Sequence, residues 1–220
     1  MNMIEVRNIT YVYPGEGKPV LKDLSFCVEK GGCLIVKGDN GAGKTTLFRV
    51  LNGLAFPVKG QYFFDGTEIT EKWLGVSRNS KLFHKKIGYL FQNPDTMLFC
   101  GTVYDEVAFG PRQMGLSDDE TDRRTRDCME LFGITDLASK APYHLSGGQK
   151  KRTALAAVTA LNPEVLVLDE PFAGLDRKSK ELLKEFLKEY HEAGKTLIAA
   201  VHDENQCELP AGEVLELQVV

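Results

Sequence analysis

The residues with the most evident chemistry lie within residues 38–46, where glycines, a lysine and two threonines are closely spaced. Gly38, Gly43, Lys44 and Thr45 match the spacing G-x-x-x-x-G-K-[ST], the pattern of a phosphate-binding P-loop. Glycines allow such a loop to turn its backbone N–H groups towards an anion without Cβ atoms in the way. A helix expected to begin at Lys44 would add its positive end at the same place. We therefore predict a phosphate site here.

Within this loop, Lys44 is expected to reach the β- and γ-phosphates, and the Thr45 hydroxyl to hold Mg²⁺. Short glycine patterns also occur by chance. Here an apolar strand is expected before the loop and a helix after it, which favours a P-loop. The loop residues predicted to bind the nucleotide are Asn40, Gly41, Ala42, Gly43, Lys44, Thr45 and Thr46.

A second candidate for chemistry is the acidic pair Asp169 and Glu170, which follows the apolar run 165–168. An aspartate at the end of a buried strand is costly unless something pairs with it, and in a P-loop protein that partner is Mg²⁺. Glu170 is expected to point to the other side of the strand end and to orient or deprotonate the attacking water. The alternative is a strand that simply ends in acidic turn residues. That alternative is weak beside a P-loop.

A second glycine-rich helix start lies at residues 145–149, with Ser146 as the candidate N-cap. It is a second possible anion site. A single small domain rarely needs two such sites for one nucleotide. The pattern therefore predicts one site on each face of a subunit that pairs with another subunit.

The elements that must position these residues alternate between strands and helices. Strands are expected at residues 4–13, 21–28, 61–64, 87–91, 165–168, 196–201 and 214–219. A long helix is expected between an N-cap at Asp176 and Gly194. Residues 94–145 are predicted to form an inserted helical subdomain, whereas residues 67–86 are polar and are not assigned. The alternation predicts an α/β core with a largely parallel sheet, in a single domain over residues 1–220.

The composition excludes several classes of function. The formal net charge of −4 gives no reason to expect nucleic-acid binding, and Lys150, Lys151 and Arg152 are interpreted as a solvated first helical turn. The 5 cysteines are scattered without a C-x-x-C pair, which argues against disulfides and zinc and fits a reducing cytosol. No secretory signal and no apolar run of about 20 residues is visible. A membrane role would therefore act through a partner.

Taken together and in order, these motifs closely resemble the ATP-binding cassette (ABC) family of ATPases. The matches are residues 38–46 with Walker A, Gln92 with the Q-loop, residues 145–149 with the family signature, residues 165–170 with Walker B, residues 173–176 with the D-loop, His202 with the switch histidine, and Tyr13 with the aromatic residue that stacks on adenine. The resemblance implies a P-loop NTPase core with a mostly parallel sheet. It also implies an N-terminal antiparallel β subdomain and an inserted helical signature subdomain.

The resemblance implies hydrolysis of ATP with Mg²⁺ in a head-to-tail dimer. Each ATP would lie between the P-loop of one subunit and Ser146 and Gly148 of the other, and Gln149 and Asp176 are assigned to the same nucleotide contacts. Gln92 would contact Mg²⁺ and the water, and His202 would hold the γ-phosphate by a hydrogen bond. Reopening of the dimer after hydrolysis would perform the work.

Residues 91–99 and 102–111 are similar to the energy-coupling-factor importers, which include cobalt, nickel and vitamin systems. In that group the helix after the Q-loop docks onto a transmembrane coupling protein, which works with a substrate-binding membrane protein. Asp105 and Glu106 would then meet arginines, and Phe99, Val103 and Phe109 would pack against the partner. The alternative is a solvated helix start with aromatics in the subdomain core. Docking would place the chain at the cytoplasmic face of the membrane as a peripheral subunit.

Three other functions are weighed against this one. The first is a soluble ABC ATPase acting on DNA or ribosomes. The interval from Gln92 to Ser146 is too short for the long coiled coil that repair-type members insert there. Ribosome-acting members normally carry two cassettes in one chain, whereas this chain has one. The second is a regulator without hydrolysis, which the intact Glu170 and His202 argue against. The third is the energising subunit of another type of ABC transporter.

Overall fold

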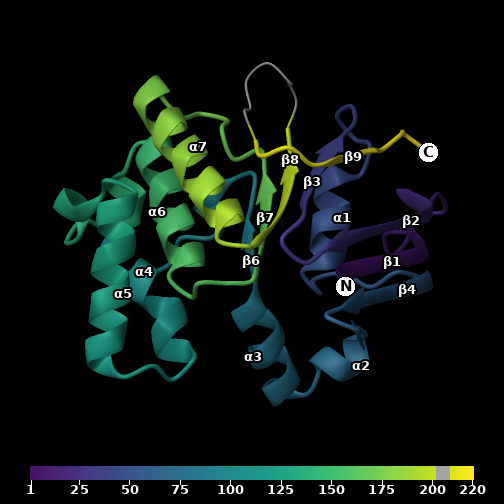
Figure 1. The fold of residues 1–220 in the computed structure, drawn as a ribbon, viewed down its shortest axis with the longest axis horizontal. Helices are drawn as coiled ribbons and strands as arrows, with labels where there is room; N and C mark the ends of the chain where they lie inside the picture. Colours follow the sequence, from purple (N-terminus) through teal and green to yellow (C-terminus); the bar gives the residue numbers. More distant parts are fainter. Residues whose placement is uncertain (202–208) are drawn as a thin grey trace.

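The computed structural model describes residues 1–201 and 209–220 of the chain, in which two sheets lie side by side with helices around them (Figure 1). The larger is a 5-stranded sheet in the order β6-β7-β8-β3-β9, and every pair of neighbouring strands in it is parallel. Its strands are β3 (Cys33–Lys37), β6 (Ile87–Leu90), β7 (Val165–Asp169), β8 (Thr196–Ala200) and β9 (Glu213–Glu216). The predicted parallel α/β core is confirmed.

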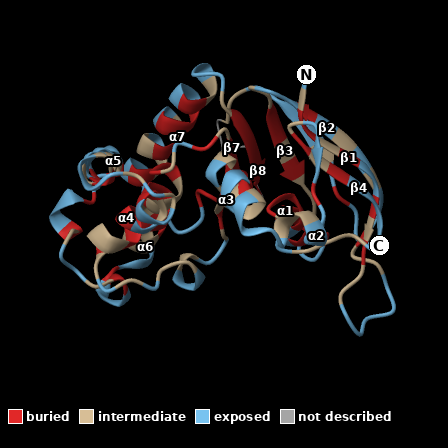
Figure 2. Ribbon diagram, turned by 90° about the horizontal axis from the view of Figure 1, so that it is seen from below, coloured by how far each residue is buried: buried red, intermediate tan, exposed pale blue. Residues whose placement is uncertain are grey.

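Strands β7 and β8 form the centre of the parallel sheet, and every residue in them is buried (Figure 2). Successive side chains of a strand point to opposite faces. Val165 and Val167 pack with the core that includes α1, whereas Leu166 and Leu168 pack with the core that includes α6 and α7. These helices are α1 (Lys44–Leu51), α6 (Gly147–Thr159) and α7 (Arg177–Glu192). Because helices cover both faces, these strands are apolar except at their ends, where β8 begins with Thr196 and β7 ends with Asp169.

The smaller sheet is antiparallel and has the order β2-β1-β4-β5. Its strands are β1 (Asn2–Tyr11), β2 (Leu21–Glu29), β4 (Lys59–Phe64) and β5 (Thr67–Glu68). Alternate residues of β1, among them Ile4 and Val6, are buried in the same core as the apolar face of α1. Helix α1 therefore lies between the two sheets and is held from both sides.

Helices dominate the segment between β6 and β7, the second and third strands of the parallel sheet along the chain. Its elements are η1 (Pro94–Thr96), α4 (Val103–Gln113), α5 (Asp118–Leu131), η2 (Thr135–Leu137) and η3 (Pro142–His144). Ser117 caps α5 through a hydrogen bond from the Glu120 N–H. Helices α4 and α5 pack against each other and against α6. This helical part forms the left-hand side of Figure 1 and ends at the glycine-rich start of α6.

The unassigned residues 67–86 form β5 and two helices, α2 (Glu71–Leu74) and α3 (Ser77–Lys86). Of the α3 residues, only Phe83 is buried, so the segment lacks the repeated apolar spacing that identifies a helix in a sequence. Among the residues that the structure describes, no helix combines the length and apolar character required to cross a bilayer.

Candidate nucleotide-binding site

A cavity of about 340 Å³ opens where β3 ends and α1 begins, at the carboxyl edge of the parallel sheet. Ligands of α/β proteins bind at this edge because the loops that follow the strands meet there. The residues that line the cavity are Tyr13, Glu16, Val20, Asp39, Asn40, Gly41, Gly43, Lys44, Thr45, Thr46, Gln92 and Glu170. Most of the predicted site residues are therefore brought together. Glu16 and Val20 were not predicted, because nothing in their local sequence indicates a site.

Two glycines of the P-loop are required by the backbone. Gly38 has φ +146°, and a Cβ there would lie 2.6 Å from the Leu217 carbonyl oxygen. Gly43 is the left-handed N-cap of α1 at φ +94°, and its Cβ would lie 2.9 Å from the Leu21 Cδ2 atom. A side chain at either position would be strained by the positive φ, and at Gly38 it would also collide with backbone. The loop is thus built to present its backbone, as phosphate binding requires.

Lys44 is the buried cation of this loop, with only 6% of its surface exposed. Its ammonium donates to the carbonyl oxygens of Gly38 at 2.6 Å and Asp39 at 3.0 Å. Both acceptors are uncharged, so the positive charge is held in place without being neutralised by them. A phosphate in the cavity would supply the neutralising charge, which fits the predicted role of Lys44.

Thr45 and Asp169 meet at the base of the cavity, where the Thr45 hydroxyl donates to Asp169 Oδ2 at 2.7 Å. Asp169 is 1% exposed. Burial raises the pKa of Asp169, the hydrogen bond from Thr45 opposes that rise, and the charge of Glu170 adds to it. A hydroxyl and a buried carboxylate are the hard oxygen donors that Mg²⁺ prefers, so this pair fits the ion.

Asp169→Asn should therefore stabilise the nucleotide-free protein while abolishing Mg²⁺-dependent hydrolysis. The raised folded-state pKa means that ionised Asp169 destabilises the fold, and this penalty grows as pH rises above the unfolded value near 4. At pH 7 we expect Tm to rise above that of the wild type, as measured by thermal melting of the nucleotide-free proteins. The gain should shrink as the pH is lowered towards 4. Equal melting of both proteins at pH 7 would contradict this account.

Tyr13 and Thr46 lie on the side of the cavity nearest the antiparallel sheet. The Tyr13 hydroxyl is 2.9 Å from the Thr46 hydroxyl, and the Tyr13 ring makes an edge contact with Tyr11. These contacts hold the Tyr13 ring beside the P-loop, at the wall of the cavity. Adenine stacking by Tyr13 remains a prediction.

Gln92 and Glu170 reach the same cavity from the ends of the neighbouring strands β6 and β7. The two strands are paired in parallel, so their ends are adjacent. Glu170 has φ +51°, which is the left-handed region and is rare for a residue with a side chain. This turn places Glu170 at the cavity wall directly after the buried Asp169. Glu170 thus lines the cavity, and its role towards the attacking water stays a prediction.

The other predicted nucleotide contacts do not line this cavity. Ser146 and Gln149 form a capping box at the start of α6, with the Ser146 N–H donating to Gln149 Oε1 at 2.9 Å. Asp176 caps α7 by accepting from the Ser179 N–H at 2.7 Å. Gly148 lies in the first turn of α6, and Ala42 is buried in the core behind the P-loop. His202 lies outside the described residues.

The expected solvated turn after the signature is wrong for Lys151 and Arg152. Lys151 is 3% exposed and donates to the Glu170 carbonyl oxygen at 2.5 Å. Arg152 donates to the Gly133 carbonyl oxygen at 2.7 Å. Lys151 lies three and four residues before the buried Ala154 and Leu155, a spacing that places it on the buried face of α6. That spacing was the sequence signal that could have predicted burial of Lys151.

The docking roles expected for Glu106 and Val103 are also corrected. Both residues are buried, and Glu106 Oε2 accepts from the backbone N–H groups of Phe99 at 2.9 Å and Cys100 at 2.6 Å. Glu106 therefore holds the loop before α4 and is not available to a partner's arginine. Asp105 is half-buried and already pairs with Arg112 at 3.0 Å.

Comparison with known proteins matches residues 21–173 to the model of the ABC transporter family. The chain is 47% identical to the nickel import ATP-binding protein LarO of Lactiplantibacillus plantarum, over 93% of this chain and 84% of LarO. It is 42% identical to the energy-coupling factor transporter ATP-binding protein EcfA of Methanosphaera stadtmanae, over 91% of this chain and 70% of EcfA.

Among solved structures, the fold matches the ATP-binding cassette MJ0796, whose dimer was captured in a post-hydrolysis state bound to ADP and Pi. The TM-score is 0.88 at 27% identity, with 99% of this chain and 96% of that chain covered. The matched family, the identities to transporter ATPases and the assembled P-loop cavity agree. The chain belongs to the ABC transporter family, as an ATP-binding cassette that hydrolyses ATP.

Proposed function

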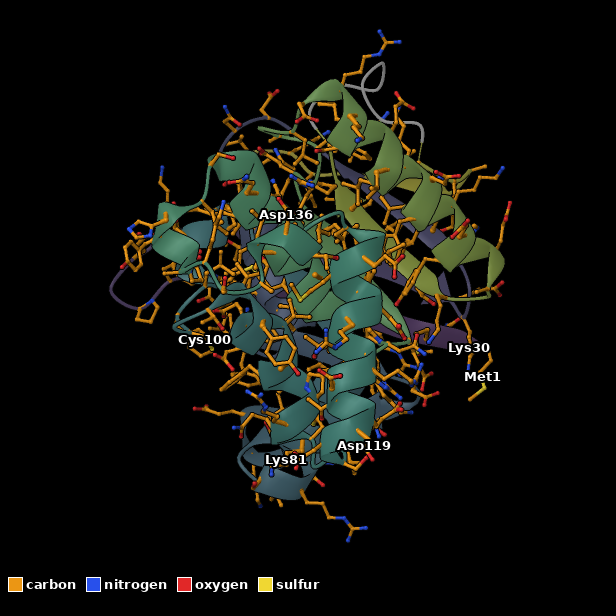
Figure 3. All side chains as sticks on the ribbon, turned by 90° about the vertical axis from the view of Figure 1, so that its left-hand side faces the viewer. Met1, Lys30, Lys81, Cys100, Asp119 and Asp136 are labelled. Carbon is orange, nitrogen blue, oxygen red and sulfur yellow. The ribbon has the colours of Figure 1, made fainter. Side chains whose placement is uncertain are left out.

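We propose that the chain is the ATP-hydrolysing subunit of an energy-coupling-factor importer, taking up nickel, cobalt or a vitamin through membrane partners. The observation that carries this proposal is an exposed aromatic pair that follows the cavity residue Gln92 in the chain. Phe99 is 68% exposed and Phe109 is 40% exposed, and their rings are 4.9 Å apart in an edge-to-face contact. Large exposed aromatics of this kind favour a protein interface. Figure 3 views this side of the molecule, with Cys100, the neighbour of Phe99, labelled.

A short, well-held segment connects this aromatic pair to the nucleotide cavity. Gln92 lines the cavity, and Asn93 caps the turn η1 by accepting from the Asp95 N–H at 3.0 Å. Glu106 then fixes the backbone of Phe99. A movement of Gln92 on hydrolysis would therefore pass to Phe99 through only a few ordered residues. This continuity supports coupling of hydrolysis to a partner bound at Phe99 and Phe109.

The residues of the cavity divide the chemistry between them. Lys44 and the P-loop N–H groups hold the phosphates, and Thr45 and Asp169 provide the oxygen donors for Mg²⁺. When bound, Mg²⁺ supplies positive charge that offsets the charge developing on the phosphates. Glu170 accepts a proton from the attacking water, which Gln92 helps to orient. His202 is proposed to hydrogen-bond the γ-phosphate.

The functional unit is proposed to be a dimer with a second ABC ATPase subunit, at the cytoplasmic face of the membrane. Ser146 and Gly148 lie in the first turn of α6, away from the cavity of their own subunit. In a head-to-tail pair this turn, with Gln149 and Asp176, would close over the nucleotide of the other subunit. The dimeric state of MJ0796 supports this arrangement.

Replacing the aromatic pair should separate partner binding from ATP binding. In Phe99→Ser/Phe109→Ser, we expect recovery of a multi-span coupling protein from gently solubilised native membranes to fall at least about tenfold, because an interface anchor of this type contributes 2 kcal/mol or more. The measurement is affinity purification of the tagged chain followed by protein identification.

The matched control is Leu82→Ser, which removes an apolar residue of α3 that is 52% exposed. This control should recover the partners as the wild type does, and both variants should retain ATP binding. Recovery of a small substrate-binding membrane protein would also indicate the substrate. If the wild type recovered only soluble partners or nucleic acid, the importer proposal would fall while the ATPase would stand.

A further inference from the structure

The buried Lys151 of α6 is a charged residue that the proposed mechanism does not use. Its ammonium donates to the carbonyl oxygens of Glu170 at 2.5 Å and Ala173 at 3.4 Å. Burial lowers the pKa of Lys151, and the carboxylates of Glu170 and Asp169 oppose that shift. An ammonium is rarely buried without a specific partner. The two carbonyl groups that accept from Lys151 therefore indicate the role of this buried lysine.

The two acceptors are the first and last residues of the turn that follows β7. Within this turn the Ala173 N–H donates to the Glu170 carbonyl oxygen at 3.2 Å. The Glu170 carbonyl therefore accepts two hydrogen bonds, one from Ala173 and one from Lys151. Glu170 itself adopts φ +51°. A left-handed residue with a side chain persists only when its surroundings hold it there. Lys151 supplies that hold from a different element, the helix α6.

The same helix also lies close to the residues that directly follow this turn. A Cβ on Gly148 would lie 3.6 Å from the Gly174 carbonyl oxygen and 4.0 Å from Leu175 Cδ2, so the first turn of α6 lies close to Gly174 and Leu175. Helix α6 therefore approaches this stretch at two points. Gly148 lies near Gly174, and Lys151, one helical turn later, donates to Glu170 and Ala173. The position of α6 and the backbone conformation of Glu170 are therefore coupled within one subunit, through the contacts of Lys151 and Gly148.

We propose that Lys151 is a positioning residue, which fixes the left-handed turn at Glu170 so that the carboxylate faces the attacking water. This inference rests on the proposed role of Glu170 as the general base. It also joins the two nucleotide sites of the proposed dimer. The start of α6 serves the nucleotide of the partner, whereas Glu170 serves the nucleotide of its own subunit.

The test is steady-state ATP hydrolysis by the full chain with Mg²⁺, in Lys151→Met, Lys151→Leu and Lys151→Arg. Methionine preserves the length of the side chain and removes the donor. We expect kcat to fall about 10- to 100-fold with KM changed less than about threefold, because the phosphate-binding residues are untouched. For Lys151→Arg, the decrease in log kcat should be at most half of the decrease in Lys151→Met, because arginine keeps a charged donor.

Lys150→Met is the matched control. It removes a lysine from the neighbouring position of the same helix, where the ammonium pairs with Asp95 at 2.6 Å instead of contacting the turn. Its kcat should stay within about threefold of the wild type. A Lys150→Met effect as large as that of Lys151→Met would overturn the proposal. If Lys151→Met does not fold, Lys151→Leu decides, since leucine also lacks a donor and a folded leucine variant with wild-type kcat would overturn the proposal equally.

A double-mutant cycle with Glu170→Gln separates positioning from general damage. If Lys151 acts through Glu170, adding Lys151→Met to Glu170→Gln should lower the residual rate by less than about twofold. Fully additive losses would overturn the proposal. If Glu170→Gln alone hydrolysed ATP normally, the role of Glu170 would fall first. A normal Lys151→Met beside an inactive Glu170→Gln would refute only the role of Lys151.

Discussion

Glu170→Gln should nearly abolish ATP turnover and trap the protein as an ATP-bound dimer. Glutamine keeps the size of the side chain and its place at the cavity wall but cannot accept the proton of the attacking water. General base catalysis contributes about 10²- to 10⁴-fold, so we expect kcat to fall at least 100-fold. ATP affinity should be retained, because Lys44 and the P-loop are unchanged. Turnover assays and size-exclusion chromatography with ATP and Mg²⁺ measure both effects.

Glu181→Gln provides the control, because it neutralises a glutamate of α7 whose side chain is 65% exposed and pairs with Lys184. This control should hydrolyse ATP as the wild type does and should not accumulate as a dimer. If Glu170→Gln hydrolysed ATP at the wild-type rate, Glu170 would not be the general base, and a different group would have to activate the water.

Lys44→Met should remove most of the affinity for ATP. The Lys44 ammonium is buried against uncharged carbonyls, so methionine removes the charge while it keeps the length of the side chain. Two unit charges about 4 Å apart at an effective dielectric constant of 20 interact by about 4 kcal/mol, which corresponds to roughly 10³-fold in affinity. Titration with a fluorescent ATP analogue measures the change.

The fold of Lys44→Met should be retained, since a buried charge is replaced by an apolar group of similar size. Lys30→Met removes a surface lysine that is 3.5 Å from Glu164, and it should leave ATP affinity unchanged. Binding of ATP by Lys44→Met within about threefold of the wild type would show that the lysine does not contact the phosphates.

The parallel core could be predicted because its local signals agree. The run 165–168 is apolar and β-branched, which is typical of a strand buried on both faces, and the structure places it at the centre of the sheet. The caps at Ser146 and Asp176 could be predicted for a similar reason, since a side chain that bonds its own helix start is a local event. The helices at residues 71–86 could not, because α2 has no buried residue and α3 has one.

Predicting the nucleotide cavity required both the sequence motif and the tertiary structure. The spacing from Gly38 to Thr45 predicted the loop, whereas the contact of Thr45 with Asp169 joins residues far apart in the sequence and arises from the adjacency of β3, β8 and β7. Sheet order is set by packing over the whole core, so no local pattern reports that distance. The motif predicted the two groups, and the fold brought them into contact.

By itself, the sequence determined which groups this protein brings to ATP, because a P-loop, an acidic strand end and helix caps depend on neighbouring residues. Only the tertiary structure decided which charged residues are buried. Glu106 accepts from the backbone before α4, and Lys151 donates to the turn at Glu170. Both were interpreted from the sequence as charges accessible to solvent or to a partner, although the spacing of Lys151 before Ala154 and Leu155 places it on the buried face of α6. Their positions depend on contacts between separate elements, and burial of a charge is settled by the partners that those contacts supply.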